Sequence, residues 1–155
     1  MLKAGSKAPN FTLPDQEQRE ISLSDLLQPG PVILYFYPAD FTPGCTRQAC
    51  SSRDLHEAIV SAGLGIVGIS PQDSASHQRF REQYDLPFSL LSDKHKSVIR
   101  KYGVDGPFGV GVRRASFLVD KAGSIQATLR ADFRVRRHEE FLRKAIESRN
   151  REPRR

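Results

Sequence analysis

The most constraining feature of the chain is a short apolar run that ends abruptly and is followed by its two cysteines. Val32 to Tyr37 is a continuous run rich in aromatic and β-branched residues, which is typical of a buried central strand. Proline and glycine end this run and deliver Cys45 to the first turn of a predicted helix that also carries Cys50. The free N–H groups and positive dipole end of such a helix favour an ionised sulfur. The segment therefore predicts a reactive thiolate.

The rest of the chain alternates strands with helices. Residues 10–13 and 20–23 predict an N-terminal β-hairpin, and Ser24 is expected to cap one helical turn after it. Further strands are predicted at 66–69, 90–91, 116–119 and 125–129, helices at about 44–60, from Ser74, from 92 or 93 to 102 and from Arg137, and a glycine-rich loop at 103–111. This order predicts an α/β fold, a three-layer α/β/α sandwich around a central mixed β-sheet.

Length and charge limit the classes of protein to which the chain can belong. Its 155 residues fit one domain, which we predict at 1–148, with a basic and disordered tail at 149–155. No apolar run approaches the ~20 residues of a membrane span and no signal peptide is visible, so we expect a cytoplasmic protein without a membrane partner. Residues 130–155 hold ten basic and five acidic residues, or +5 of the net charge of +6. Without interleaved aromatic residues or a known binding module, this indicates a solvated helix face and no specific nucleic-acid partner.

The residues that commonly bind metals do not form a recognisable pattern. Two thiols are too few for a zinc site, which needs about four ligands. The four histidines, His56, His77, His95 and His138, are scattered, and we expect each to be an ordinary surface or helix histidine. The CxxxxC spacing also differs from the CxxC of thiol redox motifs. The sequence therefore predicts neither a metal nor a bound cofactor.

The spacing of the cysteines limits how they can react with each other. On one regular helix, five positions place their Cα atoms ~8.7 Å apart and about 140° around the axis. A disulfide needs a Cα separation below about 7 Å, so Cys45 and Cys50 cannot bond while this helix is intact. Either the first turns unwind to let a redox pair react, or Cys45 is the active thiol and Cys50 is a small core residue.

Pro38-x-x-x-Thr42-x-x-Cys45 after a strand resembles the active-site motif of the peroxiredoxins. The longer string FYPxDFTPGCTxxAC resembles the peroxiredoxin Q subfamily, also called bacterioferritin comigratory protein. Other blocks fit in the same order, from Gly5-x-x-Ala-Pro9 near the start to Leu91-Ser92-Asp93, Tyr102-Gly103-Val104 and Arg114-x-Ser-Phe-Leu-Val-Asp120. The resemblance covers nearly the whole chain, from Gly5 to about Ile146.

The resemblance implies a thioredoxin-like fold and a thiol peroxidase that reduces hydrogen peroxide and organic hydroperoxides. It implies that Cys45 is the peroxidatic cysteine and that Cys50 resolves its sulfenic acid as an intramolecular disulfide. By the same resemblance, the Thr42 hydroxyl bonds thiolate and peroxide, Pro38 shields the pocket, and the Arg114 guanidinium lies beside the sulfur. A thioredoxin-like or glutaredoxin-like protein would supply the electrons. Because the disulfide is intramolecular, we expect a monomer.

The sequence departs from the family pattern at two places and leaves two alternative functions open. Gln48 stands where many members carry Glu, and the loop at 105–112 is shorter than in some relatives. Arg113 precedes Arg114, so a shift of one residue in strand register would exchange their faces. The alternatives are a thiol-disulfide oxidoreductase on the same fold and a non-enzymatic redox sensor or carrier of a soft metal such as Cu(I).

Overall fold

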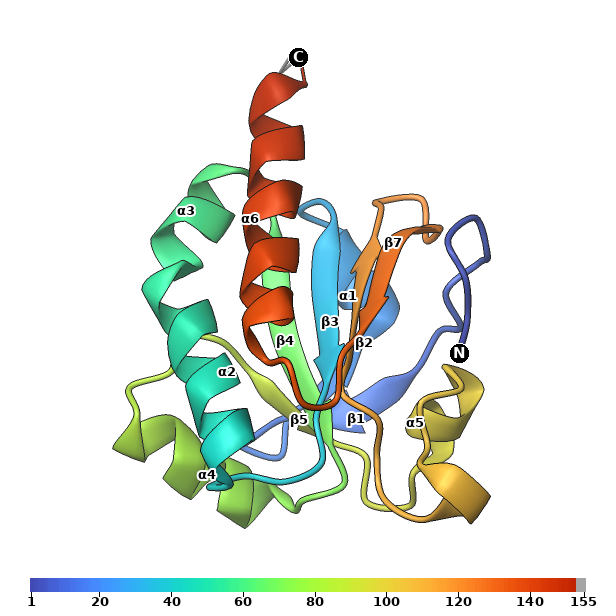
Figure 1. Cartoon of the computed structure of the whole chain (residues 1–155), viewed down its shortest axis with the longest axis vertical. Coiled ribbons are helices and arrows are strands. Elements are labelled where there is room, and N and C mark those ends of the chain that lie inside the picture. The colour runs from blue at the N-terminus through green and yellow to red at the C-terminus, as the bar shows by residue number, and fades with distance from the viewer. Residues whose placement is uncertain (153–155) are drawn as a thin grey trace.

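The computed structural model describes residues 1–152 as a central sheet with helices on both faces (Figure 1). The strands are β1 (Thr12–Pro14), β2 (Glu20–Ser22), β3 (Val32–Phe36), β4 (Gly65–Ser70), β5 (Leu90–Ser92), β6 (Ala115–Val119) and β7 (Ile125–Arg130). The helices are α1 (Leu23–Leu27), α2 (Pro43–Asp54), α3 (His56–Ser61), α4 (Ser74–Gln83), α5 (Ser97–Lys101) and α6 (Arg136–Arg151), with a 3₁₀ turn at Pro107–Gly109. None of the helices in this described part is long and apolar enough to cross a membrane.

The apolar run predicted as a central strand is β3, the middle strand of the main sheet. The strand order is β5-β4-β3-β6-β7, in which β4 and β5 run parallel to β3 while β6 and β7 form an antiparallel pair beside it. β1 and β2 pair with each other as a separate antiparallel hairpin. The mixed sheet and the N-terminal hairpin are both confirmed.

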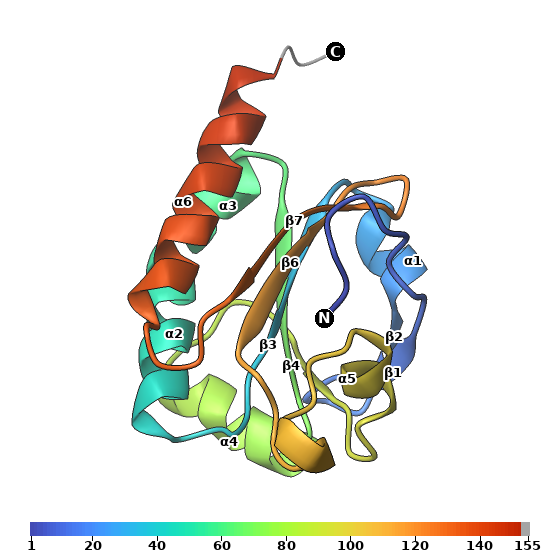
Figure 2. The ribbon, with the colours of Figure 1, turned by 45° about the vertical axis from the view of Figure 1, so that its right-hand side comes forward.

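Alternate side chains of β3 point into two hydrophobic cores, one on each face of the sheet. Val32, Leu34 and Phe36 lie in one buried cluster with the hairpin, α1 and α5. Ile33 and Tyr35 point to the opposite face, into a cluster with residues of α2, α3, α4 and α6. Figure 2 shows α2, α3 and α6 on one side of the sheet and the hairpin, α1 and α5 on the other. The predicted three-layer sandwich is therefore confirmed.

Several predicted helix boundaries were wrong. α1 is capped by Ser22 and not by Ser24: the Ser22 hydroxyl accepts the Asp25 N–H, and the Asp25 carboxylate accepts the Ser22 N–H in a reciprocal capping box. The single helix predicted at 44–60 is divided at Leu55 (φ −92°, ψ −1°), which is the C-cap of α2 and the N-cap of α3. As predicted, the helix stops near Gly63: α3 ends at Ser61, Ala62 is its C-cap, and Gly63 follows with the positive φ of +75° that glycine tolerates best.

The start of α5 and the end of α6 also differ from the predictions. α5 begins at Ser97 because the chain first makes a turn, although the predicted cap Asp93 still accepts the N–H of Ile99 at 2.7 Å. The tail predicted at 149–155 is wrong for its first residues, since α6 continues to Arg151. Arg149 holds this end in place by donating to the Ala62 carbonyl at 3.1 Å. Residues 153–155 lie outside the described part.

Candidate active site

The turn between β3 and α2 presents Cys45 at the start of a helix. Pro43 occupies the first helical position, where its fixed φ fits and no N–H is needed. Cys45 follows two residues later, with only 1% of its surface exposed. Because the first N–H groups of a helix have no acceptor within it, the start of α2, where Cys45 lies, carries partial positive charge. The strand-to-helix placement predicted for Cys45 is therefore confirmed.

Arg114 brings a full positive charge to the same sulfur. It lies directly before β6, which pairs with β3, and its Nη2 donates to Cys45 Sγ at 3.3 Å. Its Nη1 donates to Gln48 Oε1 at 2.6 Å, so one guanidinium spans the sulfur and a side chain one turn later in α2. Arg113 instead forms an ion pair with Asp132 at 3.6 Å and is partly exposed. Arg114, and not Arg113, therefore faces the cysteine, which is the position that the resemblance implied.

Thr42 and Pro38 line the approach to the helix. Thr42 occupies the N-cap position, and its hydroxyl donates to the Ala39 carbonyl at 3.0 Å. That bond directs the hydroxyl hydrogen away from the sulfur, so the role implied for Thr42 stays a prediction. Pro38 is half-buried two residues after the end of β3, and its shielding role stays a prediction too.

Cys50 is half-buried in the middle of the wound α2 helix, and both thiols are free. The two cysteines therefore occupy one intact helix with the five-residue spacing that forbids a disulfide. Regular helical geometry gives a Cα separation of ~8.7 Å. This is the arrangement expected of the reduced protein, before any bond between the thiols.

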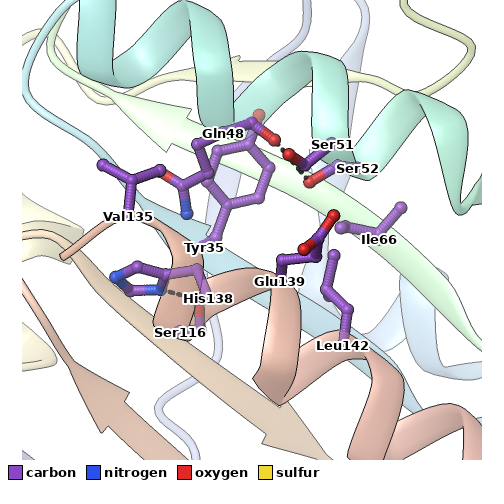
Figure 3. Close-up of a pocket in the computed structure, with 10 residues that line it drawn as sticks. All are labelled: Tyr35, Gln48, Ser51, Ser52, Ile66, Ser116, Val135, His138, Glu139 and Leu142. Carbon is purple, nitrogen blue, oxygen red and sulfur yellow. Dashed lines mark hydrogen bonds between the residues drawn. The ribbon is translucent and has the colours of Figure 1, made fainter.

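A small cavity lies behind α2, on the side of the helix that faces the sheet and α6 (Figure 3). Its volume is about 10 Å³, close to the least that a water molecule needs. Tyr35 lines it, and the Tyr35 hydroxyl is buried without a hydrogen-bond partner among residues 1–152. Burial, followed by the nearby charge of Cys45, raises the pKa of Tyr35 well above its ordinary value, so the hydroxyl keeps its proton. Gln48 lines the same cavity and accepts a hydrogen bond from Arg114, so its side chain links the cavity to the guanidinium beside Cys45.

Sequence reasoning missed a buried polar network that holds the loop leading to Cys45. The Asp40 carboxylate receives hydrogen bonds from the hydroxyls of Tyr37 at 2.6 Å and Ser76 at 2.8 Å. His77 Nδ1 lies 2.7 Å from the same carboxylate, and its Nε2 donates to the Leu91 carbonyl at 3.1 Å. Asp40 also lies inside the motif that carried the family resemblance, which was the one signal that could have pointed to it.

Two of the histidines expected to be ordinary surface or helix residues, His77 and His138, do lie in helices but are buried in polar networks. His77 is fully buried in the Asp40 network. His138, at the start of α6, is also buried; its Nε2 donates to the Ala131 carbonyl at 3.0 Å and its Nδ1 accepts from the Ser116 hydroxyl at 2.8 Å. Burial lowers the pKa of His138 from 6.5 to about 4, so its ring is neutral near neutral pH.

Comparisons with known proteins show which family the chain is similar to. Residues 4–128 match the model of the AhpC/TSA family. A putative chloroplastic peroxiredoxin Q of Oryza sativa subsp. indica is 46% identical over 138 residues, which cover 88% of this chain and 63% of that protein. The putative peroxiredoxin bcp of Coxiella burnetii is 46% identical over 132 residues, covering 81% of this chain and 87% of its own.

Solved structures show the same fold. The peroxidoxin BcpB of Mycobacterium tuberculosis superposes with a TM-score of 0.89 at 33% identity, covering 96% of this chain and 98% of its own. The bacterioferritin comigratory protein of Xanthomonas campestris, described in terms of its alkyl peroxide reduction activity, gives 0.81 at 25% identity, covering 89% and 90%. The chain therefore belongs to the AhpC/TSA family, among the peroxiredoxins of the peroxiredoxin Q and bacterioferritin comigratory type.

Proposed function

We propose that the chain is a thiol peroxidase that reduces hydrogen peroxide and organic hydroperoxides. The observation that carries this proposal is the 3.3 Å contact between Arg114 Nη2 and Cys45 Sγ at the start of α2. A guanidinium and free backbone N–H groups stabilise a thiolate and the negative charge that develops as the O–O bond breaks. The Cys45 thiolate attacks one peroxide oxygen and becomes a sulfenic acid, while the other oxygen takes a proton and leaves as water or alcohol.

Cys50 then resolves the sulfenic acid. Its thiolate attacks the Cys45 sulfur, so that an S–S bond forms and the S–O bond breaks, and the sulfenic OH takes a proton and leaves as water. Because an intact α2 holds the two Cα atoms ~8.7 Å apart, this step requires the turns between the cysteines to unwind. Resolution therefore couples chemistry to local unfolding.

The remaining expectations concern partners and location. A thioredoxin-type or glutaredoxin-type dithiol protein would return two electrons to the disulfide, as expected for this family. We also propose a monomer, because both cysteines belong to one helix and no second subunit is needed. The cytoplasmic location stays a prediction.

Single-turnover kinetics with each cysteine variant test this function. The reduced protein mixed with one equivalent of hydrogen peroxide should rapidly lose both thiols and give a monomeric disulfide. Cys45→Ser should lose all peroxide reduction, whereas Cys50→Ser should complete one round and stop at the sulfenic acid. Peroxide consumption as slow as that of a free thiol would refute the proposal. Disulfide exchange without peroxide reduction would indicate a thiol-disulfide oxidoreductase.

A further inference from the structure

A group of exposed side chains beside the active site has no role in the fold. We call it the arginine patch, and its members are Arg47, Phe133, Arg134, Arg136 and Arg137. They line an open hollow of about 550 Å³ together with Val135 and one acidic residue, Glu140. The patch draws together the loop before α6, the start of α6 and the exposed side of α2.

The hollow lies directly against the turn that carries Cys45. A Cβ placed on Gly44 would lie 3.6 Å from Val135 Cγ2 and 3.0 Å from Arg114 Nη2. The same loop is tied to the site through Asp132, whose Oδ1 accepts the backbone N–H of Arg114 at 2.9 Å. A molecule bound in the hollow would therefore lie at the start of α2.

The charges of the arginine patch are not neutralised by the rest of the described chain. None of its four arginines forms an ion pair within residues 1–152. The nearby carboxylate of Asp132 is already shared by Arg113 and Arg130, at 3.6 and 3.3 Å. The hollow is therefore a concentrated positive field that favours an acidic partner.

Phe133 indicates a macromolecular partner. Its ring is 96% exposed, so it contributes nothing to either core. Arginine and aromatic side chains are enriched in protein interfaces and dominate their binding energy. A small peroxide is too small to cover this ring and the arginines around it, whereas the surface of a folded protein can bury the ring and pair with the arginines.

We propose that the arginine patch is the docking surface for a protein dithiol reductant that carries an acidic face. This inference rests on the peroxidase function proposed above, which leaves a Cys45–Cys50 disulfide to be reduced. A thiolate of the docked protein attacks one sulfur of that disulfide, forming a mixed disulfide and releasing the other cysteine as a thiolate. Its second thiol then attacks the mixed disulfide and frees the remaining cysteine. Two electrons pass to the enzyme, and the partner leaves oxidised.

Charge steering of this kind has a measurable signature. It raises association rates by about 10- to 1,000-fold and is lost as salt increases, because the Debye length falls to about 8 Å near 0.15 M. A neutral small dithiol such as dithiothreitol does not experience the steering. The ratio of the rates with the protein reductant and with dithiothreitol therefore separates docking at the arginine patch from the chemistry of disulfide reduction.

The test compares reduction of the oxidised protein by an acidic thioredoxin and by dithiothreitol at low and high salt. Charge reversal at Arg134→Glu with Arg136→Glu should lower kcat/KM for the thioredoxin by about 10-fold or more at low salt and remove most of its salt dependence. Turnover with dithiothreitol should not change. The matched control is Lys101→Glu with Lys121→Glu, two exposed lysines on α5 and in the β6–β7 turn, and should behave like the unaltered protein.

Each outcome is informative. Equal losses in the patch variant and in the lysine control, or a thioredoxin rate insensitive to salt, would overturn the proposal while turnover with dithiothreitol still upheld the peroxidase function. No turnover with either reductant would refute the peroxidase function itself. If the patch variant loses binding of a single-stranded oligonucleotide but keeps its thioredoxin kinetics, the patch serves a polyanion and the proposal is wrong.

Discussion

Replacing Arg47 by alanine and by glycine measures whether α2 must open before the cysteines meet. Arg47 is exposed, lies in α2 between Cys45 and Cys50, and forms no ion pair with any described residue. Both replacements remove the same long side chain and its charge. They differ chiefly in helix propensity, by which glycine disfavours the helix by about 1 kcal/mol relative to alanine. If opening precedes the disulfide, this difference appears directly in the cost of opening.

A difference of about 1 kcal/mol corresponds to a factor of about five in an equilibrium constant. Arg47→Gly should therefore form the disulfide about five times faster than Arg47→Ala in the phase that does not depend on peroxide concentration. The assay mixes reduced protein with one equivalent of hydrogen peroxide, quenches with acid at successive times and measures the disulfide by mass spectrometry. The matched control is Ala58→Gly, an exposed position in α3 outside the opening segment.

The control variant should be less stable to heat, yet form the disulfide at the rate of the unaltered protein. Equal rates for the two Arg47 variants would refute the reasoning, because they would mean that the disulfide forms with this turn still wound.

Three further predictions follow from the contacts around the site. In Arg114→Lys, the single lysine ammonium cannot reach both the Cys45 sulfur and the Gln48 side-chain amide. Since a hydrogen bond to a charged group contributes about 1.5–3 kcal/mol, the rate of peroxide reduction should fall about 10- to 100-fold in stopped-flow measurements. Arg113→Lys is the control and should keep the unaltered rate. Because folding lowers the pKa of His138 from 6.5 to about 4, the unfolded chain binds more protons than the folded chain between these pH values. The contribution of His138 to the free energy of unfolding should be fully present above pH 6.5 and should be lost, by up to about 3 kcal/mol, as the pH falls toward 4. His138→Gln should remove this pH dependence in urea titrations. Asp40→Asn leaves the buried His77 ring without its carboxylate partner, so the free energy of unfolding measured by urea denaturation should fall by about 3 kcal/mol. The same replacement of an exposed aspartate should leave this free energy unchanged.

Opposite results would be equally clear. An unaltered peroxide rate in the Arg114 variant would show that the guanidinium does not act on the sulfur. Stability that stays constant from pH 7 to about 4 would show that His138 titrates alike in the folded and unfolded chain. A stable Asp40 variant would mean that the network is not a source of stability.

The sequence was sufficient wherever one strong local pattern controlled the structure. The short apolar run, rich in aromatic and β-branched residues and followed by proline and glycine, was correctly predicted as a buried strand, and the proline and glycine placed Cys45 in the first turn of α2. Alternation left open which of Arg113 and Arg114 faces the cysteine, and Arg114 was chosen by the family resemblance; the structure places Arg114 on the sulfur and Arg113 on Asp132. The two-layer covering of the sheet followed from the alternation of strands and helices.

The remaining features depend on partners that are distant in the sequence. Asp40 and His77 meet across 37 positions, and neither residue alone has a pattern that shows it will be buried. Arg149 belongs to a basic end that was predicted to be a tail, and its contacts with the distant Ala62 carbonyl and with Glu152 could not be foreseen from this composition. The choice of Ser22 over Ser24 required the acidic residue three positions after the true cap to be weighed.

The central claim is that Cys45 and Cys50 bond only when α2 unwinds between them. Amide hydrogen exchange of the reduced and oxidised protein tests it most directly, because the N–H groups after Cys45 are helical in the reduced state, as shown by the Thr46 N–H bound to the Thr42 carbonyl at 2.8 Å. Oxidation by one equivalent of peroxide should give the disulfide and remove protection from the amides between the two cysteines, while α3 stays protected. A disulfide formed with these amides still protected would contradict the account.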